Sequence, residues 1–138
     1  METLETSSVR LDTSVLIDNL RGKQTVTFIR RLEEAGIILS TTAVTSFELY
    51  YGAYRSKRRD KHLAVTRTSL SRLIVLELSD ESSDEAGRIL ALLEDRGTLI
   101  GFRDAMIAAI ATTHKMKLAT RDAEHFSRVS DLEILAAP

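Results

Sequence analysis

Short apolar runs alternate with amphipathic stretches along this chain, and this alternation restricts its fold more than any other feature. The runs are rich in Ile, Leu and Val, as is typical of strands that are buried on both faces. Stretches with helical spacing separate one run from the next. Strands that are separated by helices pair in parallel, so the order of elements predicts an α/β fold with a parallel sheet covered by helices on both faces.

The expected strands lie at residues 9–11, 37–39, 73–76, 117–120 and 132–135. The expected helices are a short one that begins at Val15, a helical turn around Glu124, and longer ones over residues 25–34, 43–55, 58–70, 83–95 and 103–114. Thr41 or Thr42 can cap the second of these longer helices, because a threonine hydroxyl accepts a hydrogen bond from a free backbone N–H. Gly36 and Gly97 suit the ends of two others.

A length of 138 residues fits one domain, which we expect to span residues 1–138 with a flexible tail at residues 1–8. The chain has no cysteine, which excludes disulfides, thiolate zinc sites and cysteine nucleophiles. Its N-terminus lacks the basic and apolar regions of a signal peptide, and its longest apolar run, residues 105–111, is too short to span a membrane. We therefore expect a cytoplasmic protein.

Charge is distributed unevenly, although the net charge is only −1. Residues 54–72 carry seven basic side chains against one acid, a local excess of +6. Such a segment attracts a polyanion, or it is a solvated helical face with no partner.

Two aspartates directly follow expected strands. Asp12 comes after the strand at residues 9–11, and Asp122 follows Arg121 after the strand at residues 117–120. If these strands are parallel neighbours, both carboxylates lie at the carboxyl edge of the sheet, where α/β proteins bind ligands. For Asp12 alone, the alternative is a turn residue or a helix cap.

Glu48 lies on a helical stripe whose other members are apolar or aromatic: Val44, Phe47 and Tyr51. No basic residue stands three or four positions away in the same helix. A carboxylate on such a face is costly unless it is paired, so Glu48 either binds a cation or meets a base from elsewhere in the fold. Asp104 stands at the start of a helix, where the helix dipole favours an acid in any case.

These four acids can converge in one cleft. Oxygen ligands alone suit Mg²⁺ or Mn²⁺ rather than zinc, and such ions can activate a water and neutralise a phosphodiester. Together with the basic segment, they indicate metal-dependent phosphodiester hydrolysis. His62, His114 and His125 show no metal-ligand spacing, and we interpret them as surface or structural residues.

In four motifs, at residues 11–14, 47–52, 101–109 and 120–126, the chain resembles the PIN-domain ribonucleases, and most closely the VapC toxins of prokaryotic toxin–antitoxin pairs. The resemblance implies a three-layer α/β/α sandwich, Mg²⁺ or Mn²⁺ as cofactor, and cleavage of single-stranded RNA. It also implies a homodimer and a VapB-type antitoxin whose C-terminal part covers the cleft.

The site residues that the resemblance implies are an acidic quartet that holds the metal and performs catalysis: Asp12, Glu48, Asp104 and Asp122. Ser14 and Thr120 are the polar residues expected to support them. In the basic segment, Arg58, Arg59 and Lys61 are the candidates for contacts with RNA phosphates.

Three alternatives agree less well with the sequence. A PIN nuclease of RNA maturation or decay is disfavoured by the small size, and an inactive binding module by the presence of all four acids. A phosphoaspartate enzyme of the haloacid dehalogenase type is disfavoured because residues 12–14 lack the second aspartate of its Asp-x-Asp signature.

We predict that Asp12→Asn, Glu48→Gln and Asp104→Asn each abolish RNA cleavage and growth inhibition in a protein that still folds. Each change removes a ligand charge and nearly preserves volume. Asp122→Asn does less harm, because relatives can carry Asn at this position. Cleavage assays beside circular dichroism spectra check this, and full activity of folded Asp104→Asn contradicts it.

Overall fold

The computed structural model describes residues 14–18 and 23–138. The expected tail at residues 1–8, the expected strand at residues 9–11 and Asp12 lie outside the described residues. Within them, no helix is both long and apolar enough to cross a membrane.

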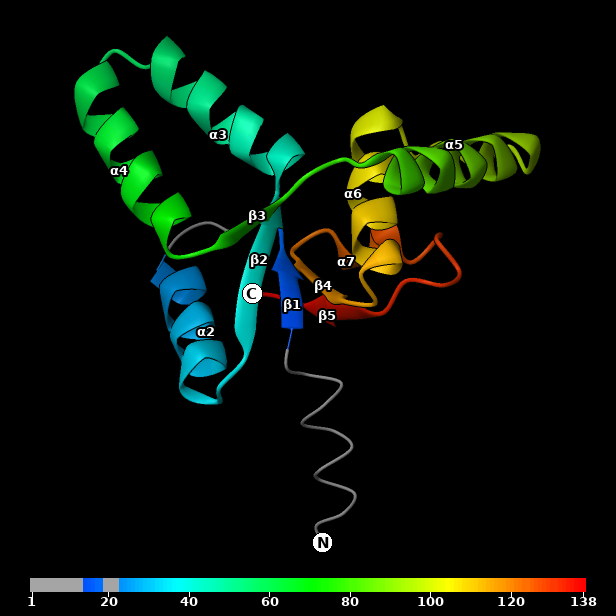
Figure 1. The fold of residues 1–138 in the computed structure, drawn as a ribbon, viewed down its shortest axis with the longest axis horizontal. Helices are drawn as coiled ribbons and strands as arrows, with labels where there is room; N and C mark the ends of the chain where they lie inside the picture. The colour runs from blue at the N-terminus through cyan, green and yellow to red at the C-terminus, as the bar shows by residue number, and fades with distance from the viewer. Residues whose placement is uncertain (1–13, 19–22) are drawn as a thin grey trace, which may run out of the picture.

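A parallel sheet forms the centre of the molecule (Figure 1). In the described part of the chain it has five strands: β1 (Ser14–Ile17), β2 (Ile38–Thr42), β3 (Ile74–Leu76), β4 (Lys117–Thr120) and β5 (Ile134–Ala136). Their order is β3-β2-β1-β4-β5, and every neighbouring pair is parallel. The predicted parallel sheet is therefore confirmed, with β1 at its middle.

Six helices connect or follow the described strands: α2 (Lys23–Glu34), α3 (Ala43–Arg55), α4 (Arg59–Ser71), α5 (Asp80–Asp95), α6 (Phe102–Thr113) and α7 (Ala123–Phe126). Helices lie on both sides of the sheet, with α2 on one side and α5 and α6 on the other, which makes a three-layer α/β/α sandwich (Figure 1). Helices α3 and α4 form a hairpin that stands out from this body.

The two faces of β1 supply two separate cores, because successive side chains of a strand point to opposite sides. Val15 and Ile17 pack with Leu39, Ala119 and side chains of α2. Leu16 points the other way and packs with α5, α6 and α7. The side chains of Val15, Leu16 and Ile17 are all buried, as a central strand of a doubly covered sheet requires.

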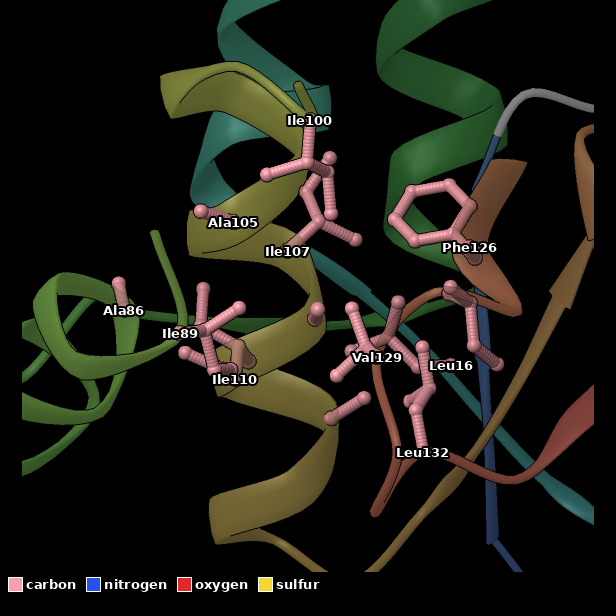
Figure 2. Close-up of a cluster of buried hydrophobic side chains, with 14 of the residues drawn as sticks. Leu16, Ala86, Ile89, Ile100, Ala105, Ile107, Ile110, Phe126, Val129 and Leu132 are labelled. Carbon is pink, nitrogen blue, oxygen red and sulfur yellow. The ribbon is translucent and has the colours of Figure 1, made fainter. Parts of the chain in front are cut away.

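The larger core lies between the sheet and α6 (Figure 2). Ile107 and Ile110 of α6 belong to this core together with Leu16 and Phe126, and all four side chains have no exposed surface (Figure 2). Phe126 is the largest fully buried side chain among the described residues, and it anchors the four-residue helix α7. This core fixes α6, whose first turn reaches the carboxyl edge of the sheet.

One expected element is wrong. The sequence pattern predicts a helix that begins at Val15, but the described residues 14–17 form strand β1. Val15, Leu16 and Ile17 are a continuous apolar run, and burial on both faces stabilises such a run as a central strand more than a helix with one apolar face would. The other helices and strands that fall on described residues agree with expectation, apart from shifts at their ends. The largest of these are at the start of α5, which begins early because Ser79 caps it, and at the end of β2, which continues to Thr42.

We predict that Phe126→Ala lowers the free energy of unfolding by about 3–5 kcal/mol, because it leaves a cavity in the larger core. Phe47→Ala is the matched control: this side chain is 66% exposed, and we expect a change within about 0.5 kcal/mol. Urea unfolding curves of the two variants and the parent make the comparison. Equal midpoints for both variants would show that Phe126 does not anchor this core.

Candidate active site

The direction of the chain across the sheet reverses between β1 and β4. From β1, the chain proceeds to β2 and β3 on one side, and then returns to β4 and β5 on the other. At such a switch point the loops diverge and leave a crevice beyond the carboxyl ends of the strands. Asp18 lies there, directly after β1, and its backbone N–H donates to the carbonyl of Ala119 in β4 (3.0 Å). The topology therefore places a carboxylate at the expected ligand-binding edge.

The end of β4 adds two polar residues to the same edge. Thr120 is fully buried, and its hydroxyl accepts a hydrogen bond from the backbone N–H of Asp122 (3.0 Å). This bond shapes the turn into α7, whose first residue follows Asp122. Both residues thus stand where the sequence placed them, at the carboxyl end of a strand beside β1.

Glu48 comes from α3, which starts directly at the end of β2. Thr42 caps this helix, since its hydroxyl accepts a hydrogen bond from the N–H of Thr45 (3.0 Å). The predicted cap is therefore confirmed, and it fixes where the helix begins. Glu48 follows in the second turn, and its side chain is 40% exposed.

Arg103 and Asp104 lie in the first turn of α6. Gly101 precedes the helix with a φ of 89°, a conformation that residues with a side chain rarely adopt. The turn at Gly101 directs the start of α6 to the carboxyl edge of the sheet. As expected, Asp104 stands where the helix dipole favours a negative charge.

Three carboxylates converge on the guanidinium of Arg103. Its Nε donates to Glu48 Oε2 (2.5 Å), and its Nη1 donates to Asp104 Oδ1 (2.6 Å). Its Nη2 and Nη1 donate to Asp18 Oδ1 and Oδ2 (2.8 and 3.3 Å). All three nitrogens of one side chain therefore join acids that follow β1 or belong to α3 and α6.

Burial differs strongly within this cluster. The side chain of Asp18 has no exposed surface, whereas that of Arg103 is 35% exposed. Thr45 also donates to Asp18 Oδ1 (2.8 Å), so both oxygens of this carboxylate are satisfied. Burial alone would lower the pKa of Arg103, but its hydrogen bonds to Glu48, Asp18 and Asp104 raise it. Arg103 is therefore a permanent cation.

His125 touches the cluster from α7. Its Nε2 lies 2.8 Å from Asp104 Oδ2, the oxygen that Arg103 does not engage. The sequence offers no metal-ligand spacing for this histidine, which favours a surface or structural role. The contact shows that it supports Asp104 from the side opposite Arg103.

The chemistry of this donor set suits a hard divalent cation, because it consists of carboxylate oxygens at a ligand-binding edge. One guanidinium against three carboxylates leaves an excess of two negative charges. Within residues 14–18 and 23–138, however, no group of three acidic or histidine side chains is arranged so that it could hold a metal ion. Three of the carboxylates form ion pairs with Arg103 instead.

The structure thus brings Glu48 and Asp104 together, and places Thr120 and Asp122 at the same edge of the sheet. Ser14 is the first residue of β1 and pairs with Ile38 at the start of β2, so it lies at the opposite end of the strands. Sequence reasoning missed Asp18 and Arg103. Asp18 follows the apolar residues 15–17, the same signature that identified Asp12.

The stripe around Glu48 differs from expectation. Its pattern predicts that Phe47 and Tyr51 lie on a buried face, but they are 66% and 57% exposed. Their rings stack on each other (centroids 6.0 Å apart), because residues four positions apart are neighbours on one helix face. The partner of Glu48 is a base from elsewhere in the fold, one of the two expected alternatives.

The basic candidates lie apart from the acids. Arg58, Arg59 and Lys61 are exposed at the turn between α3 and α4, and the Nε of Arg59 donates to the carbonyl of Tyr54 (3.2 Å). Glu48 is closer to the other end of α3. The structure therefore offers two regions: an acidic edge and a basic tip.

We predict that Asp18→Asn lowers the free energy of unfolding by about 3 kcal/mol, because it removes one partner of a buried ion pair. Glu33→Gln is the control, since it breaks an exposed ion pair with Arg72 and should cost less than about 1 kcal/mol. Denaturant unfolding without divalent metal compares the two. An equal decrease in both variants would mean that Asp18 and Arg103 do not stabilise the edge.

Known proteins are similar to this chain in sequence and fold. The family model of the PIN domain matches residues 9–132. Ribonuclease VapC2 of Haemophilus influenzae is 33% identical over 119 residues, which cover 86% of this chain and 89% of that protein. The tRNA(fMet)-specific endonuclease VapC of Shigella flexneri is 32% identical over 123 residues, covering 88% and 92%.

Solved structures agree. DNA-bound VapBC from Salmonella typhimurium superimposes with a TM-score of 0.79 at 28% identity, covering 89% of this chain and 97% of that one. VapBC2 from Rickettsia felis, bound to a promoter DNA fragment, has a TM-score of 0.82 at 21% identity and covers 91% and 99%. The chain belongs to the PIN-domain family and, within it, to the VapC ribonucleases.

Proposed function

We propose that this protein is a metal-dependent endoribonuclease that cleaves single-stranded RNA and acts as the toxin of a VapBC-type pair. The observation that carries the proposal is the convergence of Asp18, Glu48 and Asp104 at the switch point of the sheet. Acids from three separate elements meet there at a cost in repulsion, which a site for cations explains.

Relatives support the reaction class. The similar proteins of Haemophilus influenzae and Shigella flexneri are named a ribonuclease and a tRNA-specific endonuclease. Each match extends over most of both chains. We therefore assign RNA phosphodiester hydrolysis to this chain, in the cytoplasm, where RNA is available and a chain without cysteine needs no oxidising environment.

The acids that would hold Mg²⁺ or Mn²⁺ are Asp18, Glu48 and Asp104, with Asp12 and Asp122 as the further candidates from the sequence. A bound divalent cation supplies an activated water and neutralises charge on the phosphodiester. Thr45 orients the carboxylate of Asp18, and His125 holds the outer oxygen of Asp104. Thr120 fixes the turn that carries Asp122.

A partner protein would cover this edge. Phe47, Tyr51 and Phe102 lie on the two helices that supply Glu48 and Asp104, with more than half of their surface exposed. Apolar side chains grouped in this way are typical of a surface that another chain covers. We assign it to a VapB-type antitoxin in a complex of homodimeric toxin, because similar structures are VapBC complexes.

Cleavage of a defined RNA tests the proposal. The parent should cut single-stranded RNA with Mg²⁺ or Mn²⁺, leave it intact with EDTA, and cut duplex RNA poorly. Glu48→Gln should be inactive, and Glu85→Gln, which changes an acid of α5 paired with Arg88, should keep parental activity. Cleavage in EDTA, or by both variants equally, would contradict the metal-dependent mechanism.

Side-by-side assays of Asp12→Asn and Asp18→Asn test whether both aspartates are needed for the reaction. We expect both variants to be inactive in cleavage. Asp12 lies in the matched motif, and Asp18 lies in the observed cluster.

We predict that replacing Arg58, Arg59 and Lys61 together by Ala weakens RNA binding and flattens its salt dependence. On a log–log plot the slope should fall by roughly 0.7 for each RNA phosphate that the variant no longer binds, as for single strands. Binding of a catalytically inactive parent and of the triple variant is measured at several salt concentrations. An unchanged slope would assign the basic tip to a protein partner.

A further inference from the structure

The role of Arg103 exceeds that of an ordinary ion pair. Its Nε, Nη1 and Nη2 all donate to acids, and those acids come from three different parts of the fold. A divalent cation bound by Asp18, Glu48 and Asp104 would need the same carboxylates. The guanidinium and the metal ion are therefore competitors for one set of ligands.

Electrostatics makes the two cations exclude each other. Two added positive charges a few ångströms from a guanidinium repel it, and the repulsion is strong where little water screens it. An arginine guanidinium keeps its proton in proteins, so this side chain cannot relieve the repulsion by becoming neutral. It has to move away.

Arg103 is also better able to move than Asp18. Asp18 is completely buried and held by Thr45 and by the neighbouring strand. The side chain of Arg103 is 35% exposed and belongs to neither hydrophobic core. Its long chain can rotate toward solvent and leave the acids in place.

We propose that Arg103 is the built-in counter-cation of this site, which holds the carboxylates together without metal and must be displaced before a divalent ion binds. The inference rests on the proposed metal-dependent function and names what limits metal affinity. It makes Arg103 a positioning residue, because it acts on the ligands and not on the RNA.

The test measures Mn²⁺ binding by titration calorimetry on the full chain, without RNA. Arg103→Gln removes the competing charge, so we expect Mn²⁺ to bind about ten- to a hundredfold more tightly than to the parent. In EDTA the same variant should melt at a lower temperature, because the acids no longer have their cation. Added Mn²⁺ should then raise its melting temperature more than that of the parent.

Three further variants test whether the lost charge of Arg103 causes the change in Mn²⁺ affinity. Arg72→Gln, which removes an exposed arginine paired with Glu33, should bind Mn²⁺ like the parent. Arg103→Lys keeps the charge but lacks the planar guanidinium that joins the three carboxylates. Its affinity for Mn²⁺ should therefore lie between those of the parent and Arg103→Gln. Adding Asp104→Asn to Arg103→Gln should remove the gain. If Arg103→Gln does not fold in EDTA, Arg103→Lys carries the comparison.

Unchanged or weaker Mn²⁺ binding in the folded Arg103 variants, beside metal-dependent cleavage by the parent, overturns this inference alone. Absence of Mn²⁺ binding and of cleavage in the parent overturns the proposed function and the inference with it. A gain in affinity that persists with Asp104→Asn also overturns it, because the metal then binds elsewhere.

Discussion

The buried carboxylate of Asp18 is the constraint on which the rest of the site depends. A charge with no exposed surface is stable only when it is paired and fully hydrogen-bonded. The chain meets this requirement from two directions, since α6 supplies a guanidinium and α3 supplies a hydroxyl. In addition, β4 accepts a hydrogen bond from the backbone N–H of Asp18. The charge of one residue therefore joins α3 and α6 to the end of β1.

The same constraint relates packing to chemistry. The core between α6 and the sheet has no direct part in the site, yet it determines where the first turn of α6 lies. Gly101 then sets the direction of the chain, and the guanidinium reaches the carboxyl edge as a result. Stability of the core and geometry of the site are thus two consequences of one packed interface.

Most of the fold could be predicted, because periodicity and caps are local properties of the sequence. The sequence singled out Glu48 because it is a charged residue on an otherwise apolar stripe. It singled out Asp104 because this residue stands at the start of a helix. The secondary structure of residues 15–17 was harder to predict. The apolar residues 15–17 suit a strand or a buried helix equally, and only the strands on either side favour the strand. Arg103 was missed because most of its partners are distant in sequence, and the exposure of Phe47 depends on how α3 packs.

An acidic site without its metal has to be neutralised from within, and a permanent cation does this without titrating. Lysine would offer a point charge with three donors, whereas the planar guanidinium joins three carboxylates along fixed directions. That geometry holds the three carboxylates together on one guanidinium, although within the described residues they are not arranged as a metal site. It also sets a threshold, because an ion has to outcompete the guanidinium for the same oxygens. The contact between the three acids and the restraint on metal binding therefore follow from a single side chain.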